Sequence, residues 1–256
     1  VYKRQNWDYM TRAVAISPVP GNIETTEFDY KGVNKIVYQE NGVTIRSIPA
    51  IHSGDGPVSY ILEYKGMKVA IGGDTFPNKW FLQYAKGVDF AIHECFMGPE
   101  QFVKYYNQPP GLAWRACCAF HTSGPAFGKV MSEINPRHAV AYHFLNEEAT
   151  RYTLYDEVRS TYDGPLSMAA DMMVWNITKD KITERMAVSP EEAWSVPGEA
   201  VQPPPEKGRP TEYTQWILDG RWDIGAQPAQ KELLDKHMEK YNLQDQDWRK
   251  QMMKQQ

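Results

Sequence analysis

The sequence predicts a layered α/β sandwich, in which helices cover a sheet. Short runs that are either continuously apolar or alternating, as strands are, fill much of the first part of the chain. Stretches with apolar residues at helical spacing then separate the later runs. Strands come first, and helices and strands then follow one another without a strict β–α–β order. This order favours a layered sandwich.

Turn residues delimit the expected strands. Glu40-Asn-Gly42, Lys65-Gly66 and Lys179-Asp180 are each flanked by strand-like runs, and Asn-Gly is a strong hairpin signal. The sequence therefore predicts three hairpins. The full set of expected strands is 28–30, 35–38, 43–48, 58–64, 67–71, 88–93, 137–143, 172–177 and 182–188.

Helices are predicted mainly from capping residues and apolar spacing. Within 122–134, Thr122 or Ser123 can cap the N-terminus, apolar residues recur along one face, and Asn135-Pro136 ends the helix. Pro109-Pro110-Gly111 is expected to be a break. The other expected helices are 78–85, 99–106, 147–162 and 227–250.

Composition excludes some classes of protein. The 256 residues are 42% hydrophobic, which is enough for a substantial core. A net charge of −4 argues against a nucleic-acid binder that relies on a basic face. No run approaches the roughly 18 apolar residues of a membrane span. The three cysteines cannot all pair within one chain, and buried thiols are the expected state.

Three regions are expected along the chain. Residues 1–24 are interpreted as the remnant of a longer N-terminal part, because the chain lacks an initiator Met; residues 1–5 also match what a sequencing adapter would encode. Residues 25–189 form the expected domain. Residues 190–256 form an extended tail, with a Pro-rich linker followed by a polar helix. A missing N-terminus leaves the cellular compartment undetermined.

Candidate metal ligands follow three of the expected strands. The apolar run at 68–71 ends in Gly72-Gly73-Asp74, where glycines allow a sharp turn and leave space for a ligand. His52 follows the strand at 43–48, and His143 ends the strand at 137–143. Because strand ends of α/β sheets present functional side chains, these three residues are expected to converge on one metal ion.

Short motifs around these residues resemble those of a known family. In chain order they are Pro-Ala-Ile-His ending at His52, Gly-Asp-Thr around Asp74, His93-Glu94, His-Thr-Ser from His121, and Tyr-His-Phe around His143. The pattern resembles the metallo-β-lactamase superfamily, in the branch that contains ribonuclease Z and the arylsulfatases. Over about residues 25–190 it is more similar to the metallo-hydrolases of guanitoxin biosynthesis and to chlorothalonil hydrolytic dehalogenase.

The resemblance implies a four-layer αββα sandwich with two zinc ions at one edge. His52 and His143 would each bind one ion, and Asp74 would bridge both and so take part in catalysis. Zinc-bound hydroxide would attack a small-molecule substrate. His121 would donate a proton or stabilise an oxyanion. Three further residues are expected to orient the ligands by hydrogen bonding: His93, Glu94 and Asp171.

One departure from the family pattern is large. The motif His-x-His-x-Asp-His, which supplies the remaining ligands, is absent from this sequence. We therefore expect the polypeptide as given to bind zinc weakly and to show no turnover.

Two alternatives to a small-molecule hydrolase stay open. One is an RNA 3′-processing nuclease of the ribonuclease Z type, which the acidic balance disfavours. The other is a catalytically degenerate module for binding or dimerisation. Aromatic anchors in the tail suggest docking onto this domain or onto a second subunit, and a homodimer is expected. These anchors are Trp194, Trp216, Ile217 and Trp222.

Overall fold

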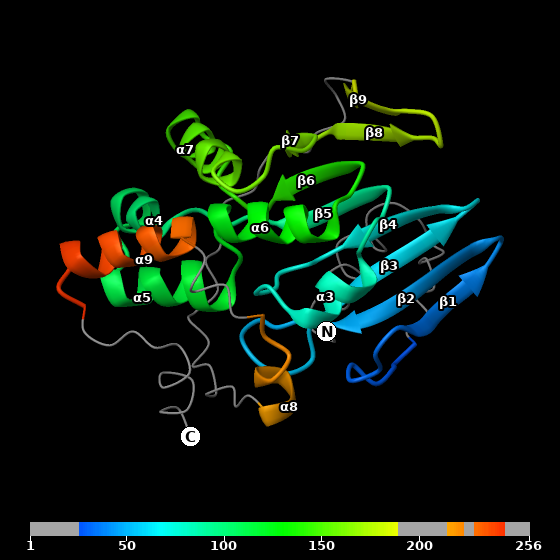
Figure 1. The fold of residues 1–256 in the computed structure, drawn as a ribbon, viewed down its shortest axis with the longest axis horizontal. Coiled ribbons are helices and arrows are strands. Elements are labelled where there is room, and N and C mark those ends of the chain that lie inside the picture. Colours follow the sequence, from blue (N-terminus) through cyan, green and yellow to red (C-terminus); the bar gives the residue numbers. More distant parts are fainter. Residues whose placement is uncertain (1–25, 189–213, 223–227, 244–256) are drawn as a thin grey trace, which may run out of the picture.

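A computed structural model describes residues 26–188, 214–222 and 228–243, and these residues form a mixed α/β fold (Figure 1). The central sheet has seven strands in the order β1-β2-β3-β4-β5-β6-β7. The predicted α/β class is confirmed. The strands are β1 (Lys35–Glu40), β2 (Val43–Pro49), β3 (Val58–Tyr64), β4 (Met67–Ile71), β5 (Phe90–Glu94), β6 (His138–Tyr142) and β7 (Leu166–Met168).

The sheet is antiparallel at one side and parallel at the other. Strands β1 to β4 pair as antiparallel neighbours, whereas β4 to β7 are parallel. The predicted hairpins are present at 40–43 and 64–67, and the third forms a separate two-stranded sheet from β8 (Met173–Ile177) and β9 (Ile182–Met186). Residues 28–30 were predicted as a strand, but Tyr30 is part of a turn and none of the three pairs with a strand of the described sheet.

Helices α3 (Lys79–Tyr84) and α6 (Gly124–Ile134) lie over one face of the sheet (Figure 1). Small side chains such as Ala70 and Ala91 on that face let the large helical residues Phe81 and Phe127 approach closely, and all four are fully buried. On the opposite face, Val69 and Ile71 are only partly buried. The described residues thus provide a helical layer and one large sheet of the predicted sandwich.

The other helices of the described residues pack around α3, α6 and one end of the sheet (Figure 1). They are α4 (Pro99–Tyr106), α5 (Pro110–Arg115), α7 (Glu148–Arg159), α8 (Gln215–Leu218) and α9 (Pro228–Lys240). A π-helical turn, Ala116–Phe120, continues α5. The predicted break at 109–111 is present but lies at 107–109, between α4 and α5. Pro110 and Gly111 instead belong to α5, because a proline at the first helical position lacks only an N–H that would have had no helical partner.

The tail packs against its own domain. Ile217 is fully buried in the core, and the ring centroids of Trp216 and Trp80 are 4.7 Å apart. On α9, the buried His237 lies 2.6 Å from Glu100 of α4. Docking on this domain is thus the interpretation that the described tail supports, and the homodimer stays a prediction. Residues 1–24 and the predicted linker, with Trp194, lie outside the described residues.

Candidate metal centre

Four strands deliver side chains to the same edge of the sheet. Strand β2 runs in the same direction as β4, because both are antiparallel to β3, and β4, β5 and β6 are parallel. Their C-terminal ends therefore meet at one edge. His52 follows β2, Asp74 follows β4, Glu94 ends β5 and His143 follows β6. The topology explains why residues so distant in sequence come together.

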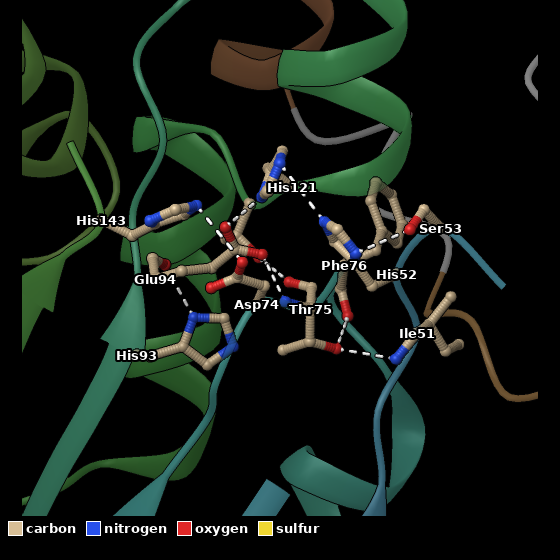
Figure 2. Close-up of polar contacts among 11 residues, drawn as sticks. Ile51, His52, Ser53, Asp74, Thr75, Phe76, His93, Glu94, His121 and His143 are labelled. Atoms are coloured by element: carbon tan, nitrogen blue, oxygen red, sulfur yellow. Dashed lines mark hydrogen bonds and ion pairs between the residues drawn. The ribbon is translucent and has the colours of Figure 1, made fainter. Parts of the chain in front are cut away.

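His121 joins this group from between the π-helical turn and α6. Its Nε2 lies 3.3 Å from Nε2 of His52. Nε2 of His143 is 3.4 Å from Oδ2 of Asp74. Figure 2 shows the three imidazoles and the carboxylate of Asp74 facing a common centre. The three predicted ligands lie in one cluster together with His121, but no group of mutually close ligand atoms among the described residues contains both His52 and His143, so their binding of one metal ion stays a prediction.

Two overlapping groups of side chains have the geometry of a metal site. One contains His52, Asp74 and His121, and the other contains Glu94, His121 and His143. Within each group, the candidate ligand atoms lie within 4.8 Å of one another. His121 belongs to both groups, so the structure allows it to be a ligand as well as the predicted proton donor.

Glu94 orients His121 from behind. Its Oε2 lies 2.5 Å from Nδ1 of His121, and its Oε1 accepts a hydrogen bond from the backbone N–H of Thr75. The ring of Phe96 stacks on His121, with centroids 4.4 Å apart and planes 16° apart. A histidine that donates Nδ1–H to a carboxylate presents its Nε2 lone pair forward, which is a common arrangement behind metal-binding histidines.

Burial shifts the protonation equilibria of the site. It lowers the pKa of both His52 and His121 to about 4, and for His52 the neighbouring His121 adds to the effect. Burial also lowers the pKa of His143 and raises that of Glu94 well above its ordinary value. The three imidazoles are therefore neutral at pH 7, which is the form that binds metal ions.

Thr75 connects the loops that carry the site. Its Oγ1 accepts a hydrogen bond from Ile51 N at 2.9 Å, and its carbonyl accepts one from Oγ1 of Thr122 at 2.6 Å. Ile51 precedes His52, and Thr122 follows His121. In the sequence Thr75 stands out only as part of a motif, because its role depends on loops that meet in the fold.

Two residues at this edge of the sheet adopt a positive φ. Gly73 has φ = 68°, and His143 adopts φ = 66°, a region that favours glycine. Gly72 lies against His93, where an added Cβ would be 2.8 Å from Cδ2 of the imidazole. Glycine is therefore required at position 72 by contact and favoured at 73 by conformation.

The other predicted orienting residues lie differently. The side chain of His93 points into the helical layer, where it is fully buried between Phe81 and Phe127, and its Nδ1 lies 2.7 Å from the carbonyl of Glu94. Asp171 is exposed in the turn before β8. Of the three, Glu94 is the one in direct contact with a histidine of the cluster.

The donor set fits a divalent cation such as zinc. Neutral imidazoles and a carboxylate are the ligands that zinc accepts in catalytic sites. The two facing Nε2 atoms of His52 and His121 can hydrogen-bond each other only if one carries a proton, whereas a cation between them would use both lone pairs.

Among the described residues, no helix is both long and apolar enough to cross a membrane.

Comparison with known proteins gives no match to a family model and none to a curated protein. Among solved structures, the chain is similar to the metallo-β-lactamase-fold protein YhfI from Bacillus subtilis, with 15% identity over 54% of this chain and 51% of that one and a TM-score of 0.41. The chain is also similar to the short form of human tRNase Z, with 14% identity over 53% of this chain and 42% of that one and a TM-score of 0.36.

A third similar structure is a putative metal-dependent hydrolase from Parabacteroides distasonis, at 19% identity over 52% of this chain and 54% of that one, with a TM-score of 0.35. The chain thus spans about half the length of these structures.

Proposed function

We propose that this chain carries the site of a metal-dependent hydrolase that acts on a small molecule. The observation that carries the proposal is the convergence of three neutral imidazoles and one carboxylate at a single edge of the sheet. The Glu94–His121 contact fixes the orientation of one of these three histidines.

In this proposal, His52, Asp74 and His143 hold zinc, with two ions expected once the remaining ligands are present. Bound zinc would supply electrostatic activation of the substrate and of water at neutral pH. Asp74 would offset the charge of the cations. His121, fixed by Glu94 and by the stacked ring of Phe96, would donate a proton to the leaving group or a hydrogen bond to a developing oxyanion.

The bond to be cleaved belongs to the ester, phosphoester, sulfate or aryl-halide class. An RNA substrate is a weaker candidate, because a net charge of −4 opposes binding of a phosphate backbone. His121 could instead be a ligand, since it belongs to both metal groups.

Metal titration combined with hydrolysis assays tests the proposal. Zn²⁺ and Co²⁺ would be titrated into the chain and into Asp74→Ala, and p-nitrophenyl acetate, bis-p-nitrophenyl phosphate and p-nitrophenyl sulfate would be offered as substrates. We expect weak binding that Asp74→Ala abolishes, and no turnover without the His-x-His-x-Asp-His motif. Metal binding that is unchanged in Asp74→Ala would contradict the assignment.

The same titration separates the two roles of His121. If it acts as an acid, His121→Ala retains metal, and a chain that also carries the upstream motif loses roughly 10²–10⁴-fold in rate. If His121 is a ligand, the variant loses metal affinity.

A further inference from the structure

The segment 214–222 of the tail docks beside the metal-binding edge. Lys79 N donates to the carbonyl of Gly220 at 2.9 Å, and Trp222 N donates to the carbonyl of Pro77 at 3.0 Å. These bonds pair the segment with the residues that directly follow the Asp74 loop. The tail segment therefore extends the backbone around the site.

Arg221 of this segment contacts two of the loops that carry the cluster. Its guanidinium carbon lies 3.6 Å from the centroid of the Phe76 ring. Its Nη1 donates a hydrogen bond to the carbonyl of Ala119 at 3.0 Å. Phe76 is two residues after Asp74, and Ala119 is two residues before His121.

Phe76 extends the connection to a third loop. Its backbone N–H donates to the carbonyl of Ile51 at 2.6 Å, and Ile51 directly precedes His52. The Phe76 side chain is buried in the core. Arg221 thus contacts the backbone segments that carry Asp74 and His121 directly, and it is linked through Phe76 to the segment that carries His52.

We propose that Arg221 is a positioning residue for the metal site, so that the C-terminal segment is part of the site's framework. The inference rests on the proposed metal-binding function. The physical reason is the shape of the side chain: a planar guanidinium stacks on an aromatic face while donating in its own plane. Here the stacking holds Phe76, and the hydrogen bond holds the end of the π-helical turn at Ala119.

Removing the guanidinium would loosen the spacing between the two loops. Metal affinity is sensitive to such changes, because groups that orient ligands from outside the coordination sphere are worth about 10–100-fold in affinity. Arg221 acts through the backbone rather than on a ligand atom, so we expect the lower end, about 10-fold.

The test compares Co²⁺ affinity, measured by absorbance titration, in the whole chain and in Arg221→Met and Arg221→Lys. Arg159→Met is the matched control: Arg159 of α7 also stacks on an aromatic ring, that of Tyr155, and donates to the carbonyls of Tyr162 and Gly164. None of these three partners belongs to a loop that carries the cluster. The thermal midpoint of each variant is recorded alongside.

We expect both methionine variants to lower the thermal midpoint, but only Arg221→Met to weaken Co²⁺ binding by about 10-fold. Arg221→Lys keeps the charge but loses the planar guanidinium, so its Co²⁺ affinity should lie between those of wild type and Arg221→Met. If Arg221→Met does not fold, Arg221→Lys provides the test. Equal affinity in wild type and in the Arg221 variants would overturn the inference alone. Absence of Co²⁺ binding in wild type would instead overturn the proposed function, and the inference with it.

Discussion

Replacing Glu157 with Gln should stabilise the protein at alkaline pH. Glu157 lies on α7 and faces the starts of two other helices: a Cβ added at Gly98 would be 3.3 Å from its Oε1, and one at Gly124 would be 2.8 Å from its Oε2. Oε2 is fully buried and has no hydrogen-bond partner among the residues that the structure describes. Burial raises the pKa of this carboxyl from 4.5 to about 7.

The sign follows from the two protonation equilibria. The unfolded chain loses this proton near pH 4.5, whereas the folded chain retains it until about pH 7. Between these values the folded state binds more protons, so the free energy of unfolding falls as pH rises and levels off above pH 7. A shift of about 2.5 units, at about 1.36 kcal/mol each, corresponds to roughly 3 kcal/mol. Two nearby helix N-termini favour the anion and offset part of that value.

Urea unfolding at pH 5 and pH 8.5 measures this effect. Glu157→Gln should raise the free energy of unfolding by about 2–3 kcal/mol at pH 8.5 and change it little at pH 5. Asp156→Asn is the control, because Asp156 is an exposed neighbour on the same helix and should change stability little at either pH. A Glu157→Gln variant with the same pH dependence as wild type would refute the argument.

Two further substitutions test packing beside the site and in the tail. Gly72→Ala places a methyl group against His93 and should lower the free energy of unfolding by about 1–3 kcal/mol. Gly111→Ala is the control, because Gly111 also lacks a positive φ and an added Cβ there would meet nothing within 4 Å; a Gly72→Ala variant that loses no stability in urea unfolding relative to this control would argue against the contact. His237→Leu removes the bonds to Glu100 and to the Pro110 carbonyl, and should cost about 1–3 kcal/mol and speed hydrogen exchange in α9; unchanged exchange there would contradict it.

The parts of the fold that the sequence predicted are those with local signals. Asn41-Gly42 and Lys65-Gly66 specify tight turns, and the flanking runs pair as expected. Asp74 was identified because two glycines interrupt an apolar run, which depends only on neighbouring residues. His52 and His143 were identified in the same way, from the ends of strand-like runs.

The missed parts depend on contacts between distant residues. Pro110 starts α5 although a proline pair also suggests a break, and no local pattern distinguishes the two. The π-helical turn before His121 has no composition of its own. Strand β7 has only three residues, Leu166–Met168, which is too short for a periodic pattern, and it forms because β6 offers an open edge. The roles of Thr75 and Arg221 exist only once the loops have met.

A final prediction concerns why a fully buried carboxylate is kept at position 94. Burial raises the pKa of Glu94 well above its ordinary value, so ionisation of this group destabilises the folded state at high pH. An amide of the same size would not ionise. Glu94→Gln should therefore be at least as stable as wild type at pH 8.5. That result would indicate that Glu94 serves His121 and not the stability of the fold.

At a pH where Glu94 of the wild type is ionised and accepts from Nδ1–H of His121, the amide would change the tautomer of that histidine. In Glu94→Gln, the new side chain could still accept from Thr75 N through its oxygen, and its NH₂ would then donate to Nδ1 of His121. The ring proton would move to Nε2, which faces His52, and the lone pair there would no longer be available to a cation. Co²⁺ affinity should fall by about 10–100-fold while stability holds or rises. Glu157→Gln, another buried Glu-to-Gln change, should raise stability without altering affinity. A joint loss of stability and affinity in Glu94→Gln would instead assign Glu94 a structural role.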